Sequence, residues 1–247
     1  MIKKKEIITE YNKKIKLLNK YNKYYYEKNN PAVDDRKYDD LKNQIQFFEK
    51  KYSFLKNKLS PSIAVGYKPS KNFIKAKHRI PMLSLSNTFN KQDLENFEKK
   101  VFNFLNLNKK ENIEYSVEPK IDGISSSLTY KNGDLVSGLA RGDGKEGELI
   151  TENLKTISDI PKTIKSENFP KDIDIRGEVF IKNKDFENFK DKFANPRNAA
   201  SGTLRQKNSE ETKKIPLKFI AYTFGHIDKL QFNKQSEFLD ALKKWGF

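Results

Sequence analysis

The 247-residue sequence contains no cysteine, only two histidines and no long apolar run. The lack of cysteine excludes disulfides and thiolate metal sites, and His78 and His226 alone argue against a histidine-based one. No apolar stretch is long enough to span a bilayer. Residues 1–6 carry charges with no apolar segment behind them, unlike a secretory signal peptide. We therefore expect a soluble, cytoplasmic protein with no membrane partner and no metal held by the protein itself.

Acidic residues are also scarce relative to basic ones. The chain has 49 Lys and Arg against 33 Asp and Glu, a formal net charge of +16. Such an excess favours polyanionic partners, nucleic acid first. The alternative is an A·T-rich genome, because Lys, Asn, Ile and Phe are all abundant. Aromatic residues make up 12% of the chain, so a packed core is feasible despite a low hydrophobic share of 36%.

The first quarter of the chain has the pattern of helices. Between residues 3 and 56, apolar positions recur mostly every three or four residues, which predicts amphipathic helices. Asn29, Asn30 and Pro31 interrupt the pattern, and the acidic pair at 34–35 offers an N-cap for a second helix. We predict a helical hairpin, followed by a surface linker over residues 60–80.

From residue 81 onward, short alternating runs and turn signals predict an α+β domain with a mostly antiparallel sheet. Asn132-Gly133 is a typical hairpin turn between two of its strands. Strands are expected at 113–121, 124–131, 134–141, 172–181 and 216–224. Helices are expected at 94–105, 186–193, 198–204 and 238–245.

The segment EPKIDG at residues 118–123 is the strongest chemical signal. Lys120 is expected at the end of a strand, with Glu118 and Asp122 pointing the same way at a spacing of two. Asp122-Gly123 is expected to turn the chain into the next strand. A lysine held among carboxylates is a candidate covalent nucleophile, and the alternative is an exposed lysine on a hairpin.

Four further segments carry glycine, charge or both. They are HRIPMLSL at 78–85, RGDG at 141–144, RGEVF at 176–180 and FANPRNAA at 193–200. Glycine permits positive φ and close backbone approach to a ligand, and arginine is suited to clamping a phosphate or ribose. Each segment alone is weak, since a glycine-rich turn is usually only a turn.

Together and in this order, these segments closely resemble the bacterial NAD-dependent DNA ligases over essentially the whole chain. The resemblance implies an N-terminal helical module at 1–68 that binds nicotinamide mononucleotide. It also implies an incomplete antiparallel nucleotidyltransferase domain at 69–247 that becomes adenylylated. The family continues with two more lysine motifs, an OB-fold, a Cys₄ zinc finger, helix-hairpin-helix repeats and a BRCT module, none of which is present in these residues.

The resemblance also implies roles for individual residues. Lys120 matches the adenylylated lysine. The residues that correspond to the family's AMP site are Ser84, Leu85, Glu118, Asp122, Gly123, Arg141 and Glu178. Those that correspond to its nicotinamide-binding residues are Tyr25, Tyr26, Asp35, Arg36, Lys37, Tyr38 and Asp39. Arg197 and Arg205 correspond to arginines that contact the reacting phosphates and DNA.

The implied reaction uses NAD and Mg²⁺ and acts on nicked double-stranded DNA. The unprotonated Lys120 amine attacks the α-phosphate of NAD and releases nicotinamide mononucleotide; AMP then passes to a 5′-phosphate, and the nick is sealed. Two alternatives stay open: a binding module that has lost catalysis, and an ATP-dependent nucleotidyltransferase that shares only the K-x-D-G signature. Without the downstream lysines and DNA-clamping domains, we expect these residues alone to be a catalytically impaired fragment.

Overall fold

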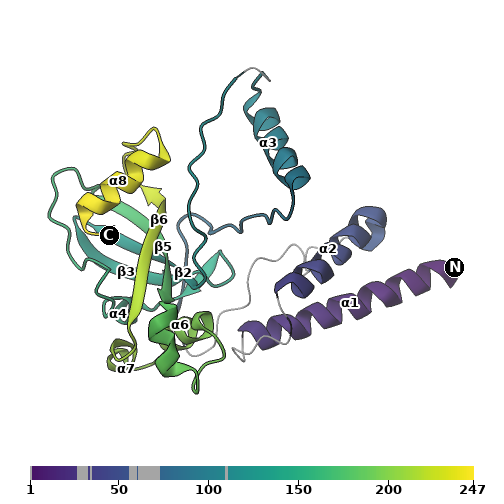
Figure 1. The fold of residues 1–247 in the computed structure, drawn as a ribbon, viewed down its shortest axis with the longest axis horizontal. Coiled ribbons are helices and arrows are strands. Elements are labelled where there is room, and N and C mark those ends of the chain that lie inside the picture. Colours follow the sequence, from purple (N-terminus) through teal and green to yellow (C-terminus); the bar gives the residue numbers. More distant parts are fainter. Residues whose placement is uncertain (1, 27–32, 34, 56–59, 61–72, 109–110) are drawn as a thin grey trace. The chain divides into compact units, whose positions relative to one another are not determined.

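The structure, a computed structural model, describes all residues except 1, 27–32, 34, 56–59, 61–72 and 109–110 (Figure 1). Contacts divide the chain into one unit of residues 1–82 with 121–247 and a second unit of residues 83–120. Helices come first and antiparallel strands follow, so the predicted α+β class is confirmed. None of the helices in the described residues is long and apolar enough to cross a membrane.

The N-terminal segment is a helical hairpin, as predicted. It consists of α1 (Ile2–Tyr26), α2 (Asp35–Lys51) and the short 3-10 helix η1 (Ser53–Leu55). Leu18 and Ile45 are fully buried where α1 and α2 pack together, and Tyr11 donates a 2.7 Å hydrogen bond to the buried carboxylate of Glu49. The predicted break at residues 29–31 lies outside the described residues. The hairpin therefore has a small apolar core of its own.

The main sheet has four antiparallel strands in the order β3-β2-β5-β6. Their bounds are β2 (Ile124–Lys131), β3 (Asp134–Ala140), β5 (Asp172–Ile181) and β6 (Leu217–Ile227), close to the predicted ranges. Asn132 and Gly133 both have positive φ, 50° and 88°, as the predicted hairpin turn requires. Beside this sheet lies a two-stranded one made of β1 (Lys75–Lys77) and β4 (Glu146–Glu148).

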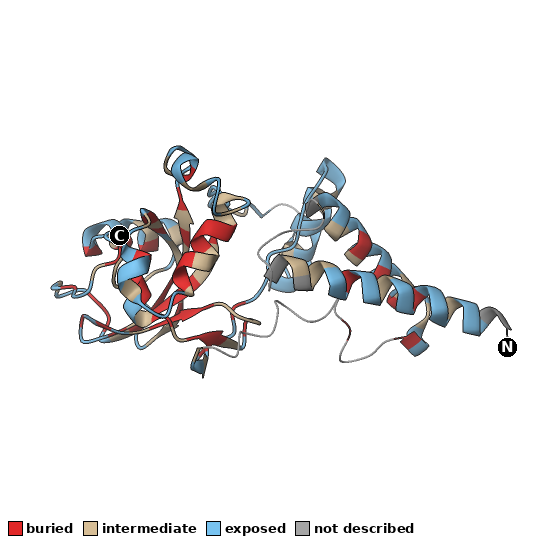
Figure 2. Ribbon diagram, turned by 90° about the horizontal axis from the view of Figure 1, so that it is seen from below, coloured by how far each residue is buried: buried red, intermediate tan, exposed pale blue. Residues whose placement is uncertain are grey.

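Helices cover the apolar side of the sheet. They are α4 (Thr151–Leu154), α5 (Asn183–Phe186), η2 (Glu187–Phe189), α6 (Pro196–Leu204), α7 (Ser209–Lys213) and α8 (Gln235–Trp245). α6 packs on β5 and α8 on β6, and the core joins Ile173 and Ile175 with Phe238 and Trp245. Buried residues follow the sheet and these helices, whereas they form only narrow patches on α1 and α2 (Figure 2).

The second unit, residues 83–120, contains the helix α3 (Lys91–Leu105). Asn90 caps its N-terminus by accepting a 2.9 Å hydrogen bond from the backbone N–H of Asp93. The predicted strand at 113–121 is wrong, because residues 113–120 have no strand partner among the described residues. Tyr115 and Val117 alternate as in a strand, yet Val117 is 92% exposed. Alternation alone cannot make a strand without a neighbour to receive its hydrogen bonds.

Other local predictions also need correction. β1 lies within the expected linker at 60–80, and β4, α4 and α7 were not anticipated. The helix expected at 186–193 occurs at 183–189 as α5 and η2. These elements are three to five residues long, too short to carry a readable period, and β1 and β4 exist only because they pair with each other.

A segment of five residues, 78–82, crosses the polar side of the main sheet; we call it the strap. His78 lies within 3.0 Å of the carbonyl oxygen of Arg141 through Nε2. Arg79 donates to both carboxylate oxygens of Asp174, and Arg176 donates to the carbonyl oxygens of Ile80 and Pro81. Side chains of the strap and of β5, together with the backbone carbonyl of Arg141, thus hold the strap on the sheet.

The two separate cores predict separable stabilities. We expect Leu18→Ala to destabilise the helical hairpin by about 2–5 kcal/mol, since it removes a fully buried side chain. The matched control Leu17→Ala, at a side chain that is 39% exposed, is expected to cost less than about 1 kcal/mol. Hydrogen exchange should show lower protection in α1 and α2 only. An equal drop in protection in β2 and β5 would contradict independent cores.

His78 predicts a pH dependence of stability. Burial, followed by the nearby positive charge of Arg176, lowers its pKa below the usual 6.5, although the hydrogen bond to Arg141 opposes the shift. The fold therefore favours neutral His78, and the unfolded chain takes up the proton first. The free energy of unfolding should fall as pH drops through about 6.5, by at most about 1.4 kcal/mol per pH unit.

The measurement is urea unfolding between pH values on either side of 6.5. His78→Gln keeps an N–H donor but cannot titrate, so it should lose this part of the pH dependence. An unchanged pH profile in His78→Gln would refute the assigned role of burial.

Candidate nucleotide-binding site

Strand β5 divides its side chains between two chemically different faces. Ile173, Ile175 and Val179 face the apolar core, while Asp174, Arg176 and Glu178 alternate with them. Asp174 and Arg176 are buried beneath the strap, and Glu178 is only half-buried. With Asp172 at its start, this central strand has four ionisable residues on one face. Such a face is costly unless each residue finds a partner, so it is a candidate functional surface.

Glu178 is held by a serine on the neighbouring strand. Ser125 stands opposite Glu178 in the β2–β5 register, and its hydroxyl donates a 2.6 Å hydrogen bond to a Glu178 carboxylate oxygen. The carbonyl oxygen of Ser125 accepts a 2.9 Å hydrogen bond from the backbone N–H of Arg141, directly after β3. Ser125 thereby connects two residues that the sequence had selected. Arg141 directly follows the end of β3, as expected, and Glu178 lies within β5 beside Gly177.

Tyr222 joins this group, and the sequence analysis missed it. The β5–β6 register shifts between Arg176 and Gly177, which leaves Tyr222 as the extra residue of a bulge. Burial raises the pKa of the Tyr222 hydroxyl. A hydrogen bond with Ser125 opposes that rise, and the negative charge of Glu178 adds to it. Bulges re-aim side chains, and no local pattern in the sequence marks this one.

Asp122 and Gly123 lie at the entrance to β2. The carboxylate of Asp122 forms a 3.0 Å ion pair with Arg197 in the first turn of α6, although the Asp122 side chain is 74% exposed. Gly123 is buried, and a Cβ at this position would lie 2.1 Å from the carbonyl oxygen of Val179. The glycine is therefore required by close approach to β5 rather than by the turn that the sequence suggested.

Arg205 occupies a different setting from Arg197. Its Nε donates a 2.8 Å hydrogen bond to Glu148, which is fully buried, and an amino group donates to the hydroxyl of Ser201. The ion pair ties the end of α6 to β4. Sequence reasoning selected Arg205 but not its buried partner Glu148.

Four of the selected residues lie in the unit of residues 83–120. Ser84, Leu85, Glu118 and Lys120 are all exposed there. Glu118 accepts a 3.0 Å hydrogen bond from Ser116. Lys120 is the last residue of this unit and lies four residues before the start of β2. The prediction that Lys120 ends a strand is therefore wrong, whereas the prediction that it lies just before β2 is confirmed.

The helical hairpin carries the remaining selected residues. Tyr38 is half-buried on α2 and donates a 2.8 Å hydrogen bond to Asn22 on α1. Asp39 beside it is also half-buried, and Arg36 and Lys37 are exposed. Tyr25, Tyr26 and Asp35 belong to α1 and α2, but their side chains lie outside the described residues.

No cluster of three histidine or acidic side chains that could hold a metal ion occurs within the described ranges. The site instead combines the Glu178 carboxylate within β5, the Ser125 hydroxyl near the start of β2, the Tyr222 ring within β6 and Arg141 directly after β3. These groups suit a ligand with a flat base, sugar hydroxyls and phosphate.

Comparison with known proteins identifies two matching families along the chain. Residues 70–247 match the NAD-dependent DNA ligase adenylation domain. Residues 4–66 match the DNA ligase-like, N-terminal NAD⁺-binding domain. The NAD⁺-binding match coincides with the helical hairpin, and the adenylation match coincides with the sheet domain that follows it.

Curated relatives agree with the family matches. A DNA ligase of Pelagibacter ubique is 62% identical over 98% of this chain, and one of Parvibaculum lavamentivorans is 44% identical over 93%. A DNA ligase of Rickettsia massiliae is 45% identical over 92%. The chain spans about a third of the length of these relatives, 36%, 34% and 34%. With both domain matches covering nearly all of its residues, this chain belongs to the NAD-dependent DNA ligase family.

Proposed function

We propose that the polar face around Ser125, Glu178 and Tyr222 binds the AMP half of NAD and that Lys120 becomes adenylylated. The observation that carries this proposal is the convergence of Glu178, Tyr222 and Arg141 on Ser125. Lys120 is close to this site along the chain, because it lies four residues before the start of β2, the strand that carries Ser125.

Each group has chemistry that fits one part of AMP. The Tyr222 ring offers a stacking surface for the adenine. The Glu178 carboxylate can accept hydrogen bonds from ribose hydroxyls, and Ser125 holds it in place. Arg141 supplies positive charge near the phosphate. Ser84, Leu85, Glu118 and Gly123 are proposed to complete the AMP site.

The Asp122–Arg197 ion pair is proposed to act at the reacting phosphates. Because Asp122 is largely exposed, exchanging this pair for an arginine–phosphate pair costs little. Arg205 is proposed to contact phosphate or DNA while Glu148 holds it. Its guanidinium has five N–H donors, and two of them bond Glu148 and Ser201 within the described residues.

The proposed chemistry proceeds in three displacements at phosphorus. The Lys120 nitrogen attacks the α-phosphorus of NAD, gives up a proton, and breaks the bond to the phosphate of nicotinamide mononucleotide. A DNA 5′-phosphate oxygen then takes the adenylyl group from Lys120. Finally a 3′-hydroxyl attacks that 5′-phosphorus, AMP leaves, and the nick in double-stranded DNA is closed.

The helical hairpin is proposed to hold the nicotinamide half. Its boundary with the adenylation domain is placed at residues 68 and 69, which the separate apolar cores and the two family ranges support. Tyr38 and Asp39 offer an aromatic ring and an acceptor on one turn of α2. Tyr25, Tyr26, Asp35, Arg36 and Lys37 are proposed to contribute from the same helices.

Mg²⁺ is proposed as a second cofactor that neutralises charge on the phosphates. Mg²⁺ binds through few carboxylates and through substrate phosphates, and Asp122 is the exposed carboxylate closest in sequence to Lys120 on the β2 side. The remaining DNA-clamping modules of the family are proposed partners, in the same or another chain. A cytoplasmic location stays a prediction from the sequence.

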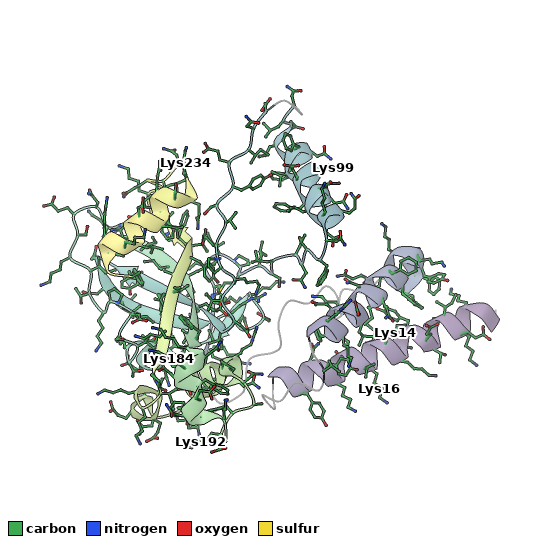
Figure 3. The ribbon with its side chains drawn as sticks, viewed as in Figure 1. Lys14, Lys16, Lys99, Lys184, Lys192 and Lys234 are labelled. Atoms are coloured by element: carbon green, nitrogen blue, oxygen red, sulfur yellow. The ribbon has the colours of Figure 1, made fainter. Side chains whose placement is uncertain are left out.

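The nucleophile can be tested by intact-mass and peptide analysis after incubation with NAD and Mg²⁺. Any adenylyl group is expected on Lys120, and Lys120→Arg should abolish labelling because arginine stays protonated. The control is Lys99→Arg, an exposed lysine of the same unit (Figure 3). An adenylyl group on Lys120→Arg, or on another lysine of the wild-type chain, would refute the assignment.

Cofactor choice can be tested in the hairpin. Asp35→Ala and Tyr38→Ala should each weaken use of NAD by about 1–3 kcal/mol, the cost of leaving one buried hydrogen bond unmade. Transfer of AMP from Lys120 that is already adenylylated should change little, because the nicotinamide half has left. Asp40→Ala on the exposed side of α2 is the control. Unchanged NAD use in both variants would reduce the hairpin to a structural appendage.

A further inference from the structure

Helix α1 has a face with positive charge and no acidic residue. Between positions 11 and 26 the sequence contains five lysines and neither Asp nor Glu. Asn12, Lys13, Lys16, Asn19 and Lys20 are all exposed and recur at helical spacing, so they line one side of α1. We call these five residues the basic stripe. Lys16 extends away from α2, whereas Lys14 reaches across to it and donates to Gln44 (Figure 3).

Several lysines in or directly after other helices have an acidic partner close by in the sequence. Five of them pair with an acidic residue three positions earlier: Lys155 with Glu152, Lys190 with Glu187, Lys213 with Glu210, Lys214 with Glu211 and Lys243 with Asp240. In the described part of the chain, none of Lys13, Lys16 and Lys20 lies within ion-pair distance of a carboxylate. The mutual repulsion of these three positive charges is therefore not neutralised by any carboxylate within the described residues, which is typical of a surface that binds an anion.

The basic stripe does not suit the protein's other anionic ligands. The opposite side of α1, with Tyr11 and Leu18, is buried in the hairpin core, and the basic stripe itself consists of Lys and Asn, so the stripe offers no apolar side chain to enter a membrane. NAD carries its two phosphates on a single bridge. Three cations from Lys13 to Lys20 extend over about 10 Å of helix, which exceeds what one such bridge can engage.

We propose that the basic stripe binds the phosphate backbone of double-stranded DNA. Along one strand of a duplex, phosphates advance by about 3.4 Å, so roughly three lie beside a 10 Å row of lysines. Lysine stems are flexible enough to meet them, and the Asn12 and Asn19 amides can donate to phosphate oxygens. The helical hairpin then has two ligands, a nicotinamide nucleotide and DNA, and the second binds without regard to base sequence.

This inference does not depend on adenylylation, so its test is carried out without NAD. The whole chain is titrated with a fluorescent duplex, nicked or intact, over a series of salt concentrations. The test variant combines Lys13→Gln, Lys16→Gln and Lys20→Gln. Glutamine is a good helix former, and circular dichroism checks that α1 remains folded. The matched control combines Lys190→Gln, Lys213→Gln and Lys243→Gln, which removes the same charge from lysines with acidic partners.

The test variant should bind duplex at least about tenfold more weakly at low salt. The slope of log affinity against log salt should fall by about 2–3, because each phosphate that a lysine neutralises contributes close to 0.9 to that slope. The control should weaken far less, and a Lys→Arg version of the stripe should bind like the wild type. Equal weakening in the test and control variants would overturn the proposal. So would unchanged duplex binding in a test variant that no longer binds phosphatidylserine vesicles, which would assign the stripe to a membrane surface.

Discussion

The paired charges on the polar face of β5 are the constraint on which the sheet domain depends. Asp174 and Arg176 are buried in the middle of a central strand, where an unpaired charge would cost several kcal/mol. Asp174 accepts hydrogen bonds from Arg79 and Thr129, and the two amino groups of Arg176 donate to two backbone carbonyls of the strap. Because residues 79–81 supply partners for both Asp174 and Arg176, the strap must lie across this face for the sheet to be stable.

The strap in turn positions the proposed nucleotide site. His78, at its start, holds the carbonyl of Arg141, and Arg141 holds the backbone of Ser125. Ser125 then orients Glu178, which lies on the same face of β5 two residues after the buried Arg176. The proposed site gains rigidity at Glu178 from this series of hydrogen bonds, since each group is oriented by one that is itself fixed.

The helical hairpin differs from the sheet domain in having a small core and a largely exposed surface. Its core is small, centred on Leu18 and Ile45, and the buried carboxylate of Glu49 accepts a hydrogen bond from Tyr11. Most of its surface is polar and open to solvent (Figure 2). One face of α1 can therefore concentrate lysines without disturbing the packing with α2.

Much of the fold could be predicted from local pattern. The ranges of β2 and β5 agree with prediction residue for residue, because period-two alternation bounded by turn residues is a strong local signal. The Asn132-Gly133 turn and the helical hairpin followed for the same reason. Motif order identified the family, since Lys120 and the segments around Arg141, Glu178 and Arg197 occur together.

The tertiary structure alone decided which of these residues meet. Tyr222 enters the site through a bulge, and Glu148 becomes the buried partner of Arg205 because β4 and α6 pack together. Residues 113–120 alternate like a strand but have no strand partner among the described residues, so they stay irregular. Composition and spacing report what one segment prefers. Pairing, burial and ion-pair choice depend on segments distant in sequence, which only the folded chain brings together.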